Sequence, residues 1–302
     1  MKTELKKVDA CKRQFTIELS KEIIEQKFEE VYREIGKNAN IKGFRPGKVP
    51  KDVLIKHHGQ LAREEVLKAL IPEYYQKALE KENLMPVDMP EIQDIKFTDD
   101  LLSFKADFEI IPEIKIKQYK GLKVKRKSAV VTDDDVKKAL EYLTKSRGEK
   151  EKEAKLDDAF AKGMGYPNVQ ELKNMVRKQL EISKEQQIKM DVENQIIEQL
   201  LKNTPLDVPA VSVKKQLEYM VNQTKSNLAH QGMKQEEIDK KEEDLRSRLK
   251  DDAVKSVKIF FILDKIAELE KIAVDKKQDF SQAVIEFLLK EAQWQEGGKD
   301  GA

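Results

Sequence analysis

Hydrophobic residues recur along the chain with two different periods, and each period predicts one kind of element. Alternation in the first residues places Phe15, Ile17 and Leu19 on one face of an extended segment. The polar stretch 9–12 interrupts this alternation, as a turn does. The chain is therefore expected to open with a β-hairpin over residues 4–19.

Helical spacing replaces this alternation from Ser20, which is a residue type that caps helices. Apolar residues then recur every three or four positions up to Ile35, which predicts the first helix. A loop over 36–50 follows, rich in glycine and proline. Two more helices are predicted after it, a short one over 51–58 and a longer one over 61–82.

Two alternating segments, 92–97 and 101–111, predict strands that complete a small α+β domain over residues 1–111. The next segment, 112–131, alternates apolar and basic residues, which is typical of an extended linker or an edge strand. Thr132 and the three aspartates after it predict a helix start, because acidic side chains favour the positive end of the helix dipole.

Almost everything from Asn168 onward has helical periodicity. The apolar residues between 172 and 200 recur every four positions, so their stripe drifts around the helix and should meet several partners. Further helices are predicted over 211–230, 235–272 and 280–294. Five consecutive apolar residues, 259–263, indicate the body's own core and predict that Phe260 is buried. The expected fold is an N-terminal α+β domain, an extended linker and an elongated all-α body over 112–302.

Composition narrows the possible functions. Charged residues make up 38% of the 302, the formal net charge is +2, and aromatic residues reach only 6%. A single cysteine excludes an intrachain disulfide framework, and three histidines leave little for a metal site. No apolar run is long enough for a membrane span, and the charged first residues do not resemble a secretory signal. We therefore expect a cytoplasmic protein with no metal, no cofactor and no membrane partner.

The most informative segment is the loop around Phe44. Five cations lie between residues 37 and 51, and no acid occurs between Glu34 and Asp52. An aromatic residue beside cations suits a folded RNA surface, since the cations meet phosphates and the ring meets a base or a crevice. The alternative is an ordinary basic loop whose Phe44 side chain lies in the core.

The stretch IKGFRPGKVP (41–50) resembles the ribosome-docking signature of trigger factor, the bacterial chaperone of nascent chains, whose pattern is G-F-R-x-G-x-x-P. The resemblance continues through 108–140, 156–181 and 203–220. It implies docking near the tunnel exit, on ribosomal RNA and protein. The implied docking residues are Gly43, Phe44, Arg45, Pro46, Gly47, Lys48 and Pro50. Pro46 departs from the family, in which many members carry lysine there, and this leaves Arg45 and Lys48 as the main cations.

The family normally inserts an FKBP-like prolyl isomerase domain at the position of residues 148–155. Here the highly charged stretch GEKEKEAK bridges the gap, too short for a domain of ~100 residues. The resemblance thus implies an ATP-independent holdase without isomerase activity, which shields nascent and unfolded polypeptides and self-associates as a homodimer away from the ribosome. No phosphate-binding loop indicates ATP.

Methionine side chains adapt to many partners, so some of those in the helical body are candidates for contact with such chains. The candidates are Met175, Met190 and Met220. Their alternative role is core filling. The main alternative is an RNA-binding module with purely structural helices. A prolyl isomerase is a third possibility, against which the missing domain argues. A periplasmic porin chaperone with a similar helical body is a fourth, against which the charged first residues and the docking loop argue.

Overall fold

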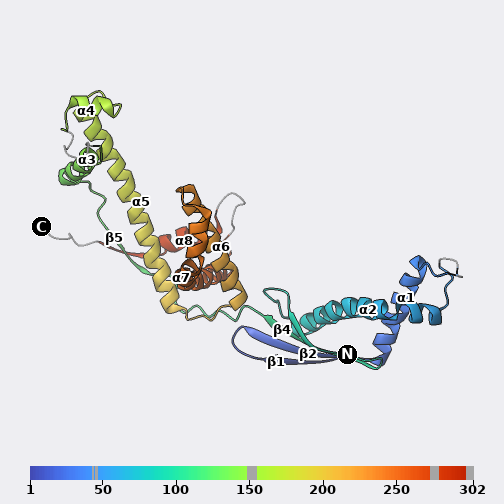
Figure 1. Cartoon of the computed structure of the whole chain (residues 1–302). Helices are drawn as coiled ribbons and strands as arrows, with labels where there is room; N and C mark the ends of the chain where they lie inside the picture. Colours follow the sequence, from blue (N-terminus) through green and yellow to red (C-terminus); the bar gives the residue numbers. More distant parts are fainter. Residues whose placement is uncertain (43, 45–46, 148–154, 273–278, 297–302) are drawn as a thin grey trace. The chain divides into compact units, whose positions relative to one another are not determined.

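The computed structural model describes residues 1–42, 44, 47–147, 155–272 and 279–296 (Figure 1). Its elements follow the expected order of an α+β region and then long helices. They are β1 (Lys2–Lys7), β2 (Lys12–Ser20), α1 (Lys21–Asn38), α2 (Lys51–Glu82), β3 (Glu91–Phe97), β4 (Leu101–Glu109), β5 (Lys123–Arg126), α3 (Asp133–Arg147), α4 (Asp158–Gly163), α5 (Val169–Asn203), α6 (Ala210–His230), α7 (Gln235–Glu270), α8 (Phe280–Lys290) and β6 (Gln293–Glu296). The expected fold class is confirmed.

The chain divides into two compact units. The N-terminal unit comprises residues 1–113 together with 206–258, and the body unit comprises residues 114–205 together with 259–302. The segment 206–258, which contains α6 and most of α7, thus belongs to the N-terminal unit in this division. The domain boundary that the sequence predicts after residue 111 stays a prediction.

The N-terminal unit is built on an antiparallel sheet in the order β1-β2-β4-β3, with α1 and α2 packed on one face. The sheet residues that alternate toward the helices are fully buried, among them Phe15, Ile17 and Phe104. On this face Phe15 lies opposite Ala106, and Ile17 lies opposite Phe104. The period-two pattern of the sequence therefore creates the apolar face on which the two helices rest.

The second and third predicted helices are one continuous helix, α2, with a local break at His58, where the backbone leaves helical geometry (φ −129°, ψ 16°). The expected end near Gly59 therefore corresponds to a kink rather than a turn. Pro72 lies inside the helix without such a break.

The body unit is organised along α5, which packs against α3 and α4 near its start and against β5 and α8 farther on. Leu172 is buried in a cluster with residues of α3 and α4, whereas Ile188, Ile196 and Leu200 are buried farther along the helix. This confirms that the drifting apolar stripe meets successive partners.

Two expectations for the end of the chain are wrong. The last helix ends at Lys290 rather than 294, and residues 293–296 form a strand, β6, that pairs in parallel with β5. Within the run 259–263, Phe261, Ile262 and Leu263 are buried, but Phe260 is 50% exposed and contacts the ring of Phe280. A core that covers one side of α7 leaves one residue of a five-residue run facing outward.

Candidate functional site

The loop between α1 and α2 is held at both ends by apolar side chains. Ile41 and Val49 pack against a small cluster that includes Tyr32, Leu54 and Ala62. Both flanks of the loop are therefore anchored on α1 and α2.

Two backbone hydrogen bonds shape this segment. The amide of Phe44 donates to the carbonyl of Ile41 at 3.1 Å, and the amide of Gly47 donates to the carbonyl of Gly36 at 3.1 Å. Gly47 adopts φ +79°, a left-handed conformation that favours glycine. Gly36 lies against Leu54, where an added Cβ would come within 3.1 Å of Leu54 Cδ1. The glycines therefore let the loop turn back tightly onto α1.

The structure places Phe44 at the surface, with 39% of the residue exposed. Lys48 and Pro50 are exposed on the same loop. Of the predicted docking residues, Phe44, Gly47, Lys48 and Pro50 thus lie together on one short segment, whereas Gly43, Arg45 and Pro46 lie outside the described residues. The alternative in which the Phe44 ring fills the core does not fit this exposure.

The five cations of this region are not equivalent. Lys37 forms an ion pair with Glu34 at 2.6 Å, and Lys51 approaches Glu29 at 3.5 Å. Lys42 and Lys48 are exposed, and neither forms an ion pair with any residue that the structure describes. The charge available for an external anion therefore concentrates on the loop rather than on its flanks.

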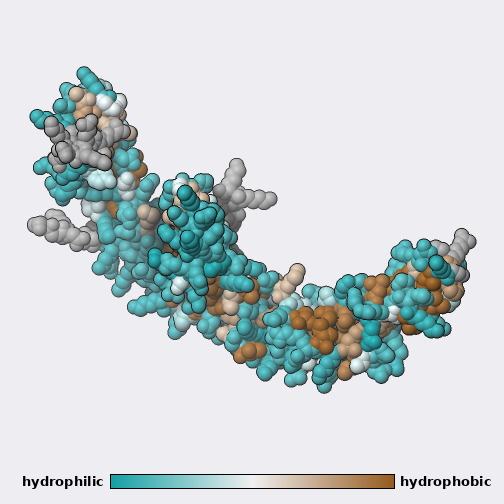
Figure 2. Space-filling view, in the orientation of Figure 1, coloured by the Kyte–Doolittle hydropathy of each residue, from teal (hydrophilic) through white to brown (hydrophobic). Residues whose placement is uncertain are grey.

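An apolar groove of about 590 Å³ lies between α1 and α2, beside the loop. Its apolar lining includes Val31, Ile35 and Leu61, and its rim carries Glu30 and Glu65. Figure 2 shows hydrophobic side chains gathered over the α1 and α2 part of this unit. The groove has no signature in the sequence, because it depends on how α1 and α2 pack against each other near the kink of α2.

The three candidate methionines do not form one site. Met175 is 44% exposed and Met190 50% exposed, and both lie on α5, roughly 22 Å apart along the helix axis. Met220 is half-buried on α6, in the other unit. Met190 lines a pocket of about 490 Å³ together with Ile285 of α8. Met190 therefore lies beside a recess that an apolar side chain of a partner could enter.

The two most exposed methionines lie outside the helical body. Met85 and Met89 are 85% and 89% exposed, in the connection between α2 and β3. Each is followed directly by a proline, Pro86 or Pro90, which restricts the backbone. This pair of Met-Pro steps is the sequence signal for the exposed methionines. Nearby, Asp88 forms an ion pair with Lys215 of α6 at 2.9 Å.

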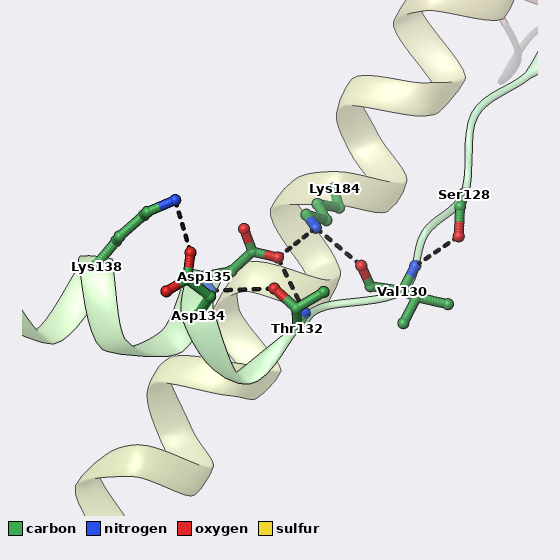
Figure 3. Close-up of polar contacts among 7 residues, drawn as sticks. All are labelled: Ser128, Val130, Thr132, Asp134, Asp135, Lys138 and Lys184. Atoms are coloured by element: carbon green, nitrogen blue, oxygen red, sulfur yellow. Dashed lines mark hydrogen bonds and ion pairs between the residues drawn. The ribbon is translucent and has the colours of Figure 1, made fainter. Parts of the chain in front are cut away.

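Polar contacts fix the start of α3 to α5 (Figure 3). Lys184 Nζ donates to Asp135 Oδ2 at 2.8 Å and to the carbonyl of Val130 at 2.9 Å. Thr132 and Asp135 also cap each other, because the amide of each donates to the side chain of the other. Lys184 first, and then Thr132, hold the pKa of Asp135 well below its ordinary value.

This contact predicts a specific pH response. Because the pKa of Asp135 is lowered by folding, its stabilising effect is present above the ordinary value of 3.8 and is lost as the pH falls through the lowered value. We expect Lys184→Gln to raise the pKa of Asp135 toward 3.8, which NMR titration of the carboxyl would measure. Lys138→Gln, which removes the partner of the neighbouring Asp134, is the matched control. An unchanged pKa of Asp135 in Lys184→Gln would contradict the assignment.

The single cysteine of the chain, Cys11, is buried. Burial, followed by the charges of Asp9, Asp207 and Glu109, raises the pKa of the Cys11 thiol to about 11, so the nucleophilic thiolate is scarce at neutral pH. The described residues contain no cluster of three or more potential metal ligands. None of the described helices is long and apolar enough to cross a membrane.

Comparison with known proteins gives two family matches. The family described as "Bacterial trigger factor protein (TF)" matches residues 1–143, and "Bacterial trigger factor protein (TF) C-terminus" matches residues 168–293. The stretch between the matches, 144–167, contains the expected insertion point at 148–155, most of which lies outside the described residues.

Relatives resemble the chain over most of its length. The trigger factor of Solibacter usitatus is 24% identical over 364 positions, which cover 90% of this chain and 86% of the relative. The trigger factor of Geobacillus thermodenitrificans is 26% identical, and the alignment covers 92% of this chain and 88% of the relative. Both alignments are longer than the 302 residues of this chain, so these relatives carry residues that face gaps here.

A solved structure shares the fold. It belongs to a study of promiscuous substrate recognition in folding and assembly by the trigger factor chaperone. The match has a TM-score of 0.53 and 16% identity, and it covers 96% of this chain and 100% of the other.

Proposed function

Because this chain belongs to the trigger factor family of chaperones, we propose that it docks on the ribosome near the tunnel exit and shields nascent or unfolded polypeptides there. Docking uses the loop 41–50, and protection consists of transient binding without ATP. The protein then works in the cytoplasm. Its self-association away from the ribosome stays a prediction.

The observation that carries the docking proposal is the exposed Phe44 with two exposed cations on the same loop, Lys42 and Lys48. Neither lysine pairs with an acidic residue in the described part of the chain. Lysine ammonium groups meet the phosphates of ribosomal RNA, while the ring enters an apolar crevice of RNA or protein. The anchors Ile41 and Val49 support this role, because a braced loop loses little conformational entropy on binding. Arg45 is included on the sequence resemblance.

Client binding rests on exposed apolar side chains amid many charges. Met190 beside its recess, Met175 on the same helix and Met220 on α6 are the proposed contacts, and Met85 and Met89 join them on the strength of their exposure. Each square ångström of apolar surface buried contributes ~25 cal/mol, so small scattered contacts bind weakly and release readily. Weak, reversible binding suits a chaperone that uses no nucleotide.

Protection of an unfolded client tests this proposal. The chain is expected to suppress aggregation of a chemically unfolded protein to the same extent with and without ATP. Met190→Ser is expected to weaken protection while leaving the melting temperature nearly unchanged. Ile182→Ser is the matched control, since Ile182 lies on the same helix, is 42% exposed and lines none of the pockets described above. If both variants lose protection to the same extent, the recess beside Met190 does not bind clients.

The alternative of an RNA-binding module makes a different prediction, namely equal affinity for naked RNA and for ribosomes. A prolyl isomerase would accelerate isomerisation of a prolyl peptide, and we expect only the uncatalysed rate. These measurements separate the three functions from one another.

A further inference from the structure

The short strand β5 has two edges with different partners. On one edge, the side-chain amide of Gln199 pairs with both backbone groups of Lys123, at 3.2 and 2.8 Å. Gln195 does the same for Lys125, at 2.8 and 2.9 Å. Two glutamines of α5 thus imitate a neighbouring strand and hold β5 extended.

The other edge of β5 pairs with β6. Because Lys123 and Lys125 direct their backbone groups toward α5, the residues between and beside them direct theirs the opposite way. There β6 lies in parallel, with Trp294 opposite Val124, and the amide of Gln293 donates to the carbonyl of Leu122 at 2.9 Å. A pair of four-residue parallel strands is marginally stable by itself.

We propose that this edge of β5, residues 122–126, is a docking site for an extended polypeptide segment, and that β6 is an internal occupant which such a segment displaces. The proposal deepens the proposed function, on which it rests, by naming one site and one mode of client binding. The incoming segment adds as a strand, so that backbone hydrogen bonds supply affinity with little dependence on sequence.

The side chains along β5 define the preferred occupant. Lys123, Lys125 and Arg126 are exposed. Neither Lys123 nor Lys125 forms an ion pair with a side chain that the structure describes. Between them, Val124 is fully buried, and Trp294 of β6 lies opposite it while remaining 52% exposed. The site therefore favours an extended segment with an aromatic residue at this register and carboxylates near it.

Weakening β6 in the full-length chain tests the proposal. Gln293→Pro removes the amide that bonds to Leu122, whereas Gln293→Ala keeps it and serves as the matched control. The probe is a fluorescein-labelled peptide, EAQWQE, that copies residues 291–296. If β6 occupies the edge nine-tenths of the time, its release raises the apparent affinity for this peptide ~10-fold. We expect that gain in fluorescence anisotropy for Gln293→Pro and little change for Gln293→Ala.

Trp294 provides a second readout, because it is the only tryptophan of the chain. Adding the tryptophan-free peptide EAQFQE to the wild-type protein should shift Trp294 emission to longer wavelength and increase its quenching by acrylamide, as β6 leaves the edge. A version of this peptide methylated on the backbone nitrogen that corresponds to Gln293 should bind less well than one methylated at the next residue.

The outcomes separate this site from the proposed function. Equal peptide affinity for wild type, Gln293→Pro and Gln293→Ala would overturn the strand site, and so would peptide binding that leaves Trp294 emission unchanged. A chain that ends at Ala292 lacks β6 and should therefore show the same gain in peptide affinity as Gln293→Pro. If the chain protects unfolded clients but fails these tests, only the strand site is refuted. If it passes them and gives no protection, the chaperone proposal fails instead.

Discussion

Ribosome affinity is expected to fall ~3- to 7-fold when Phe44 is replaced by alanine. Full burial of an exposed phenylalanine side chain contributes ~1.5–3 kcal/mol, so burial of the exposed 39% of Phe44 contributes ~0.6–1.2 kcal/mol. Each ~1.4 kcal/mol changes a dissociation constant about tenfold. Phe44 is 39% exposed on a braced loop, so its ring can be buried by a partner without unfolding of the loop. The loss should persist at all salt concentrations, because the ring carries no charge.

Val8→Ala is the matched control for this prediction. Val8 is 52% exposed in the connection between β1 and β2, at the other end of the sheet from the loop (Figure 1). Its replacement should leave ribosome affinity unchanged. Equal affinities of wild type and Phe44→Ala would remove the ring from the interface.

The second large effect concerns stability and separates two neighbours on α7. Ile262 is fully buried, so Ile262→Ala should lower the free energy of unfolding of the body unit by ~2–5 kcal/mol. Phe260 is half-exposed, so Phe260→Ala should cost less than ~1 kcal/mol despite the larger side chain removed.

Chemical denaturation followed by circular dichroism measures both variants against wild type. The order of the two effects is the decisive result, because the sequence pattern alone predicts a large cost for Phe260. A greater loss of stability in Phe260→Ala than in Ile262→Ala would show that the ring is buried in solution.

Elements with a strong period could be predicted from the sequence. The hairpin, α1, β3, β4 and the helices α5 to α7 follow from apolar spacing and caps, because one face of each element must be buried locally. The capping pair Thr132 and Asp135 is an example of a helix start that can be predicted from residue types three positions apart.

Features that depend on distant segments could not be predicted this way. The strand β6 exists through pairing with β5, about 170 residues earlier, and its own four residues carry no signal that a local pattern can detect. The exposure of Phe260 depends on which side of α7 the core covers. The inclusion of 206–258 in the N-terminal unit likewise depends on contacts such as that between Lys215 and Asp88.

The candidate loop shows the same division. Its position between two helices could be predicted from residue types, since glycine and proline interrupt both neighbouring patterns. The exposure of Phe44 could not, because residue types alone also allow its ring to lie in the core. The charge that the loop offers to a partner could not be predicted in this way. Lys51 begins α2, and only the fold brings it to Glu29 of α1, while Lys37 pairs with Glu34 on α1 itself. The sequence shows every cation, whereas the structure shows that, among the residues it describes, Lys37 and Lys51 have acidic partners and Lys42 and Lys48 do not.

The central claim is that the loop 41–50 docks the chain on the ribosome. Co-sedimentation of the chain with purified ribosomes and with naked ribosomal RNA, over a range of salt concentrations, tests it most directly. The account predicts tighter binding to ribosomes than to naked RNA, with affinity that falls as salt rises. It also predicts a shallower salt dependence for the double variant Lys42→Ala and Lys48→Ala, because two phosphate contacts are lost. Binding to naked RNA as tight as to ribosomes, or a salt dependence that the double variant leaves unchanged, would contradict the claim.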